Sequence, residues 1–131
     1  MYMLSNLKNF LYRLPKLVWS SLLSIRSIIS KIFGDPLVSM EIHGKKLYMP
    51  LSHNLPIYVR RFKFYDTALT RISKFLRLEK KNLVYVDVGA NIGDSILAIN
   101  PGEKDRIIGI EPDTKFQKYL KKNLENLDNV V

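Results

Sequence analysis

The spacing of bulky apolar residues predicts an amphipathic helix near the start of the chain. Between residues 17 and 33 these side chains recur at steps of three and four positions, while serines and a lysine take most other places. Such spacing gathers the apolar side chains on one helix face. The residues of this face are Leu22, Ile25, Ile28, Ile29 and Ile32. The face either packs on the rest of the protein or lies in the headgroup layer of an anionic membrane.

An alternation of apolar and polar residues follows, and it predicts a β-hairpin. The alternation runs over residues 38–42 and resumes over residues 47–51, with a tight turn around Gly44 between them. Glycine supplies the positive φ that such a turn needs. Pro50 indicates an edge strand, because proline has no N–H to donate. Residues 51–56 are predicted to be irregular, since Pro56 biases the preceding residue away from helix.

A second helix and a strand, loop and helix unit come next. Helical spacing runs from Tyr65 to Arg77, with Asp66 near the N-terminal end. Residues 83–88 form an apolar run that is rich in β-branched side chains and hardly alternates. This composition is typical of a parallel strand that is covered on both faces. A glycine-containing loop and a short helix at residues 95–99 follow.

The remaining pattern completes a βαβ unit. Pro101 and Gly102 end the short helix, and residues 106–110 form a second apolar strand with Glu111 directly after it. Pro112 and Asp113 then open a further helix. The last three residues, 129–131, are predicted to start a third strand.

The composition narrows the possible chemistry. With 131 residues the chain has room for one compact domain, since domains average about 150 residues. Cysteine is absent, which excludes disulfides, a thiolate nucleophile and a Cys-ligated metal, and fits a reducing compartment. The two histidines, His43 and His53, are too few for a His-rich site, so we expect no metal.

The charge is unevenly distributed along the chain. The formal net charge is +9, with +11 on residues 1–82 and −2 on residues 83–131. Such an excess suggests nucleic acid, an anionic lipid surface or an acidic ligand as partner. Nucleic acid is not favoured, because no recognition motif of interleaved aromatic and basic residues occurs.

The first 34 residues form a basic, apolar arm without an acidic side chain. Its longest uncharged stretch, residues 17–25, is far shorter than the roughly 20 residues of a spanning helix. No small-residue cleavage site of a secretory signal follows. We therefore expect a cytoplasmic protein. Where the rest of the protein does not cover the apolar face of the helix, residues 1–34 would contact the inner face of the membrane peripherally.

The chemistry-bearing motif follows the first strand of the βαβ unit. Its residues are Asp87, Gly89, Asn91 and Gly93. Glycines let the backbone approach a ligand closely, and backbone N–H groups at the start of the next helix can hold an anionic group. Glu111 lies 22 residues after Gly89, close to the spacing of about 20 at which a carboxylate binds ribose hydroxyls. A nicotinamide-binding loop is disfavoured, because Asn91 and Asp94 stand where its second and third glycines belong.

The motif resembles the first motif of S-adenosylmethionine-dependent methyltransferases, from which only the middle glycine differs. More narrowly, residues 86–93 and 109–112 resemble the FkbM-type methyltransferase family, as do the lead-in segments 51–56 and 64–69. The likeness covers roughly residues 38–131. It implies S-adenosylmethionine as cofactor and O-methylation of a sugar, glycan or secondary metabolite.

The resemblance also implies roles for individual residues. Asp87, Gly89, Asn91 and Gly93 would surround the methionine part of the cofactor, and Glu111 would hold its ribose. The structural alternatives are a carboxylate that braces the loop and glycines that serve an ordinary tight turn. His53 and the cluster Arg60, Arg61 and Lys63 are weaker candidates, for a substrate contact and for an anion clamp.

Taken together, we predict an α/β fold with an incomplete Rossmann-like parallel sheet of the class I methyltransferase kind. It is preceded by a β-hairpin and a basic amphipathic N-terminal helix. The parts are an arm at residues 1–34, a lead-in at residues 35–82 and the N-terminal βαβ part of a methyltransferase domain at residues 83–131. We expect a truncated, inactive enzyme fragment whose first βαβ strand has an unpaired edge. The alternatives are a membrane-surface or interaction module that keeps the βαβ unit as scaffold, and a nucleic-acid methyltransferase.

Overall fold

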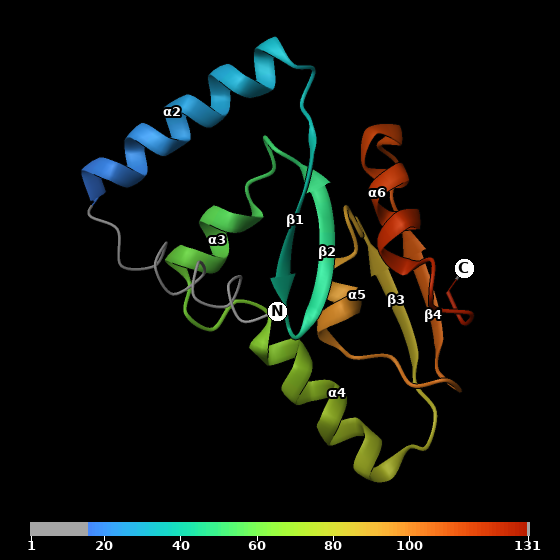
Figure 1. The fold of residues 1–131 in the computed structure, drawn as a ribbon. Coiled ribbons are helices and arrows are strands. Elements are labelled where there is room, and N and C mark those ends of the chain that lie inside the picture. The colour runs from blue at the N-terminus through green and yellow to red at the C-terminus, as the bar shows by residue number, and fades with distance from the viewer. Residues whose placement is uncertain (1–15, 131) are drawn as a thin grey trace.

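Two short sheets and the helices around them make up residues 16–130, the part of the chain that the structure, a computed structural model, describes (Figure 1). The elements are α2 (Lys16–Ile32), β1 (Leu37–Ile42), β2 (Lys45–Pro50), α3 (Leu55–Arg61), α4 (Thr67–Glu79), β3 (Val84–Val88), α5 (Asp94–Ala98), β4 (Arg106–Ile110) and α6 (Thr114–Leu124). The predicted first helix, hairpin and βαβ unit are thus confirmed.

The hairpin forms where the sequence predicts it. β1 and β2 pair antiparallel, with Ile42 opposite Lys45 at the turn. The two turn residues, His43 and Gly44, have φ values of 50° and 73°. Two successive positive φ values are the signature of a type I′ turn, whose twist matches that of the flanking strands.

Helix α3 was not predicted, and the expectation of an irregular Leu55 is wrong. The helix begins at Leu55 and has Pro56 in its first turn. Proline is tolerated there because the first N–H groups of a helix have no intrahelical acceptor. Leu55 is also completely buried, so tertiary packing overrides the local bias of the proline.

The βαβ unit is held together at its base by Asp105. β3 and β4 pair in parallel, with Val84 opposite Arg106. The buried Asp105 carboxylate accepts hydrogen bonds from the backbone N–H groups of Leu83 and Gly102 at 2.8 Å each, and pairs with Arg77 of α4. Burial alone would raise the pKa of Asp105, but these donors outweigh it and hold the pKa below 3.8.

A third strand begins where it was predicted. Val130 bridges Ile107 in parallel. Since β3 also pairs with β4, the order of the described pairs is β3, β4 and then residue 130. Within residues 16–130, β3 therefore has one edge that pairs with no other strand.

One face of β3 is uncovered. Val84, Val86 and Val88 are 72%, 52% and 77% exposed, although the composition of the strand is typical of one that is covered on both faces. The apolar run favours a strand with helices on both faces. In the structure α5 and α6 pack only on the face opposite these three valines. That packing is visible at Gly109 of β4, where an added Cβ would meet Ile96 of α5 at 3.3 Å and Leu120 of α6 at 3.8 Å.

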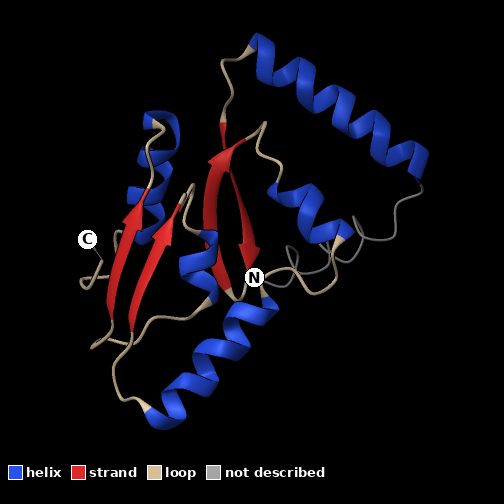
Figure 2. Ribbon diagram, turned by 180° about the vertical axis from the view of Figure 1, so that it is seen from behind, coloured by secondary structure: helices blue, strands red, loops and turns tan. Residues whose placement is uncertain are grey.

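Figure 2 shows the hairpin and the βαβ unit side by side. The two share one hydrophobic core. Its fully buried members come from both parts of the chain: Leu47, Met49, Leu55, Ile92, Ile96 and Ile107. Asn123 of α6 ties the two parts together, because its side chain bonds both backbone groups of Tyr48 in β2 and the carbonyl of Ile92. This joint packing positions the loop after β2 opposite the loop after β3.

Candidate functional site

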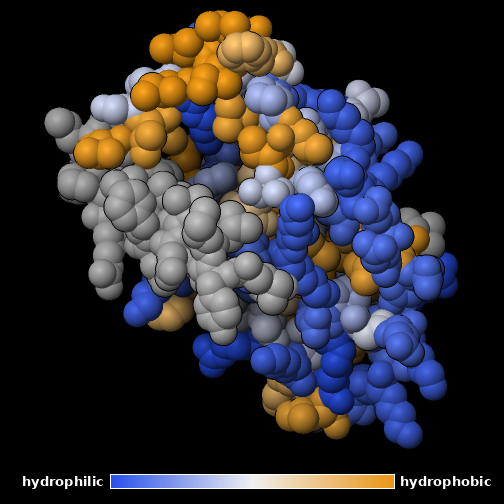
Figure 3. Space-filling view, in the orientation of Figure 1, coloured by the Kyte–Doolittle hydropathy of each residue, from blue (hydrophilic) through white to orange (hydrophobic). Residues whose placement is uncertain are grey.

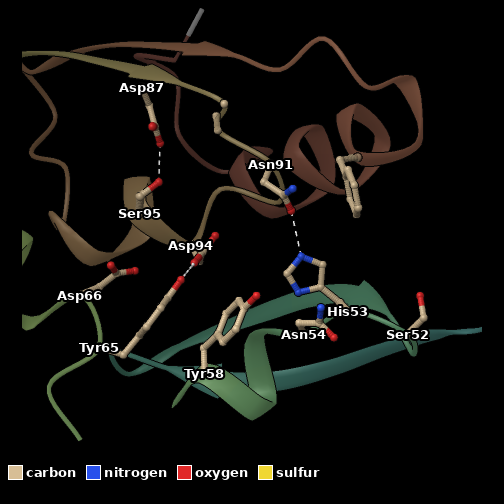
Figure 4. A pocket seen from close by; sticks show the side chains of 13 residues that line it. Ser52, His53, Asn54, Tyr58, Tyr65, Asp66, Asp87, Asn91, Asp94 and Ser95 are labelled. Atoms are coloured by element: carbon tan, nitrogen blue, oxygen red, sulfur yellow. Dashed lines mark hydrogen bonds between the residues drawn. The ribbon is translucent and has the colours of Figure 1, made fainter. Parts of the chain in front are cut away.

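A cavity of about 510 Å³ lies between those two loops (Figure 4). Its lining residues come from three regions that are distant in sequence. They are Ser52, His53, Asn54, Tyr58, Tyr65, Asp66, Asp87, Gly89, Ala90, Asn91, Asp94, Ser95 and Phe116. The cavity is at the carboxyl end of β3, the edge of a parallel sheet at which α/β proteins bind ligands.

β3 and the loop after it bring three of the five predicted site residues to the cavity: Asp87 from the strand, and Gly89 and Asn91 from the loop. Gly89 has φ 80°, and a Cβ added to it would meet nothing within 4 Å. Its open surroundings leave room for a ligand beside the backbone. Asn91 has φ 48°, a left-handed conformation that asparagine tolerates better than most residues.

Glu111 lies beside this loop, outside the cavity lining. Its Oε2 accepts the N–H of Asn91 at 2.7 Å, and its Oε1 accepts the N–H of Asp113 at 2.8 Å. Each carboxylate oxygen has a second acceptor position. Glu111 therefore braces the loop in this structure and retains capacity for a further hydrogen-bond donor.

Gly93 faces the core instead of the cavity. It is buried, has φ 86°, and an added Cβ would lie 3.0 Å from Leu120 and 3.4 Å from Leu124. The glycine is needed there because α6 packs closely on the start of α5. The five-residue α5 that follows is too short to act as a strong anion site.

His53 connects the two sides of the cavity. The N–H of Leu55 donates to its Nδ1 at 3.1 Å, so the neutral ring carries its proton on Nε2. Nε2 lies 2.9 Å from Oδ1 of Asn91 and donates to it (Figure 4). Phe116 of α6 contacts the ring edge-on, with 5.7 Å between centroids. His53 is thus fixed in one tautomer and holds the Asn91 side chain.

Three carboxylates line the cavity: Asp66, Asp87 and Asp94. Asp87 accepts a hydrogen bond from Ser95, and Asp94 accepts one from the hydroxyl of Tyr65 at 2.9 Å. Burial and the neighbouring Asp94 raise the pKa of Tyr65, which keeps the phenol protonated as a donor.

Asp66 differs from the other two carboxylates. It precedes α4 with φ 54° and makes no side-chain cap hydrogen bond to that helix. Its buried Oδ2 has no hydrogen-bond partner. Burial, with Asp94 and Asp87 nearby, raises its pKa to about 6. The ionised form of the Asp66 carboxylate is therefore unfavourable in the folded chain.

The cavity suits a cationic ligand. None of the described residues that line it is a lysine or an arginine, although the whole chain has a net charge of +9. Arg60, Arg61 and Lys63 lie outside the lining, so the anion clamp considered for them does not belong to this cavity. Across residues 16–130, no group of three His, Asp or Glu side chains is arranged to hold a metal ion.

Replacing Asp66 by asparagine is expected to stabilise the fold at neutral pH. The carboxyl is protonated in both states below pH 3.8, and its cost grows as the pH rises toward the folded pKa of about 6. We expect a gain of about 1 kcal/mol at neutral pH, after discounting for solvent screening, and none below pH 3.8.

Urea denaturation across this pH range measures the gain. Glu103→Gln, which removes an exposed carboxylate, is the matched control and should show no such pH dependence. An Asp66→Asn variant whose stability parallels the wild type at every pH would contradict the unfavourable ionisation of Asp66.

Part of the site was not found from the sequence. Asp66 and Asp94 were not assigned to it, and neither were Tyr58 and Tyr65. The two carboxylates could have been found from the sequence, because Asp66 and Asp94 each lie at the start of a predicted helix. The aromatic residues had no such signal, since the helical spacing of Tyr65 fits a core position equally well and Tyr58 belongs to no predicted element.

Comparisons with known proteins identify the fold. No family model matches the chain, and no curated protein matches it. PH0793 from Pyrococcus horikoshii, which carries a provisional assignment as a transferase, is similar with a TM-score of 0.54 and 20% identity over 82% of this chain and 45% of its own. TYW2 from P. horikoshii, solved in complex with MeSAdo, has a TM-score of 0.54 and 20% identity over 89% of this chain and 48% of its own. The chain spans less than half the length of either protein, and the predicted α/β fold is confirmed.

Proposed function

We propose that this chain binds S-adenosylmethionine in the cavity at the end of β3 and is the cofactor-binding part of a methyltransferase. The observation that carries the proposal is the set of three carboxylates around a cavity whose described lining has no basic side chain. S-adenosylmethionine presents a sulfonium and an ammonium group, both cationic, and opposite charges stabilise each other most where water is partly excluded. A phosphate-rich dinucleotide would face repulsion at the same place.

Two further observations support the cofactor. Asp87, Gly89 and Asn91 of the predicted motif line the cavity together. TYW2, which has the same fold, was solved with the S-adenosylmethionine analogue MeSAdo. In the proposed complex Asp87 holds the cationic end, and Glu111 accepts hydrogen bonds from the ribose hydroxyls.

Calorimetric titration of the full chain tests the proposal. We expect S-adenosylmethionine to bind and NADH, a dinucleotide of similar adenosine content, not to bind. The same titration at raised salt should weaken binding, because part of the attraction is between charges. Binding of NADH in place of S-adenosylmethionine would overturn the proposal.

For the acceptor we propose a hydroxyl group of a sugar, glycan or secondary metabolite. The support is the resemblance of residues 86–93 and 109–112 to FkbM-type methyltransferases. Transfer of a labelled methyl group to a panel of sugars, with RNA and peptides as competing acceptors, distinguishes the classes. Labelled RNA would instead favour the nucleic-acid methyltransferase.

We propose in addition that α2 lies on an anionic membrane surface at the cytoplasmic side. Its apolar stripe is exposed, with Ile25, Ile28 and Ile32 at 52%, 57% and 68%. Figure 3 shows hydrophobic side chains gathered along α2 at the top of the molecule. Lys31 is exposed on the same helix, and the first 34 residues contain five basic and no acidic side chains. Within the described residues no helix has the length and hydropathy to cross a bilayer.

Ile28→Glu is expected to weaken binding to anionic vesicles about tenfold, because burying one isoleucine contributes about 1.5 to 3 kcal/mol. Co-sedimentation with vesicles of phosphatidylserine and phosphatidylcholine measures it. Ser27→Glu adds the same charge at an exposed position outside the stripe and should cost clearly less. Equal losses would show that charge alone governs the contact and would contradict insertion of the stripe.

A further inference from the structure

Helix α2 reaches the cavity through Arg26. This side chain is half-buried. Its guanidinium donates to the carbonyl of His53 at 3.0 Å and approaches Oδ1 of Asn54 at 3.5 Å. Both contacted residues line the cavity. Arginine suits this role, because its planar fork can contact two acceptors of one loop at once.

Asp35, just after α2, holds the other end of the same loop. Its carboxylate accepts hydrogen bonds from the N–H and the hydroxyl of Ser52, at 2.8 and 2.6 Å. It also accepts from Ser30 of α2 at 3.0 Å and pairs with Lys115 of α6 at 3.1 Å. Although burial opposes it, this set of donors lowers the pKa of Asp35 far below its ordinary value. The loop at residues 52–54 is therefore held from α2 at both of its ends.

The contacts continue across the cavity. His53, held at its carbonyl by Arg26, donates from its ring to the side chain of Asn91. Asn91 donates from its backbone N–H to Glu111. A continuous hydrogen-bonded series thus joins α2, the loop after β2, the loop after β3 and the end of β4. Its links span 27, 38 and 20 positions of sequence.

We propose that Arg26 is a positioning residue for the cavity: it holds the 52–54 loop so that His53 keeps Asn91, and with it the loop after β3, in the ligand-binding conformation. The proposal rests on the proposed function only in its affinity readout, since the position of His53 is measurable without ligand. A merely structural arginine would support the helix without affecting the His53 ring.

The first test is a nitrogen–proton correlation spectrum of the full, ligand-free chain. The chain has two histidines, His43 and His53, so the turn residue His43 serves as the internal reference. In the wild type we expect His53 as a single neutral tautomer protonated on Nε2. In Arg26→Gln we expect the His53 Nε2 signal to shift, because the ring is no longer held on Asn91, and the His43 signal to stay unchanged. Lys31→Gln removes the same charge from an exposed position of α2 and should leave both signals unchanged.

The second test is the affinity for S-adenosylmethionine. We expect Arg26→Gln to weaken it about tenfold, the scale of one hydrogen bond to a charged group, and Lys31→Gln to leave it unchanged. Arg26→Lys keeps the charge but lacks the planar fork of the guanidinium, so it should recover part of the lost affinity. It also serves as a control in case Arg26→Gln fails to fold.

The two readouts separate the proposals. If the wild type does not bind S-adenosylmethionine, the proposed function fails, while the His53 signal still decides the role of Arg26. An unchanged His53 signal in a folded Arg26→Gln variant would overturn the positioning role. The same conclusion follows if Arg26→Gln and Lys31→Gln weaken binding equally.

Discussion

A Gly93→Val variant is expected to lose about 3 kcal/mol of folding stability, from a strained backbone and a crowded core together. The residue has φ 86°, which a β-branched side chain rarely adopts, and its Cβ would lie 3.0 Å from Leu120. The cause therefore differs from the one that the motif resemblance implies, which is contact with the cofactor. Urea denaturation followed by circular dichroism measures the loss.

Gly89→Ala is the matched comparison for Gly93→Val. Gly89 also has a positive φ of 80°, but its Cβ would point into open space at the cavity. We expect Gly89→Ala to lower the free energy of unfolding by only about 1 kcal/mol. Its loss of binding free energy for S-adenosylmethionine should be larger than that. If Gly93→Val instead folded with wild-type stability and failed to bind, Gly93 would be a ligand contact as the resemblance implies.

Glu111→Ala is expected to weaken S-adenosylmethionine binding about 10- to 100-fold, since hydrogen bonds to a charged group contribute roughly 1.5 to 3 kcal/mol. Two losses combine in this variant. The ribose would lose its acceptor, and the N–H groups of Asn91 and Asp113 would lose theirs. Calorimetry of the full chain measures the change in affinity.

Two variants separate these losses. Glu111→Gln keeps one acceptor oxygen and should fall between the wild type and Glu111→Ala. Asp113→Ala removes the cap of α6, where the carboxylate accepts the N–H of Lys115, without touching Asn91. It should reduce stability by about 1 kcal/mol and leave binding unchanged. Unaltered affinity in Glu111→Ala would remove Glu111 from the cofactor site.

Much of the local structure is predictable from the sequence because its causes are local. The type I′ turn follows from Gly44 between two alternating runs, and β3 follows from a β-branched run before a glycine. The N-cap of α6 follows from Asp113, because an aspartate before a helix can accept a backbone N–H of the first turn. In the structure its side chain accepts the N–H of Lys115. Which face of β3 the helices cover was not predictable in this way, because the residues of a strand do not show where the helices will pack.

The residue pattern along the chain is enough to predict the order of the elements, the α/β class and the motif residues that line the cavity, Asp87, Gly89 and Asn91. Tertiary structure alone decided what stands opposite them. Asp66, His53 and Arg26 are 21, 38 and 65 positions from Asp87 or Asn91, and no short-range pattern relates them. They meet because the hairpin and the βαβ unit bury one shared core. Burial of apolar surface is non-directional, so only the complete packing specifies which polar groups face each other across the cavity.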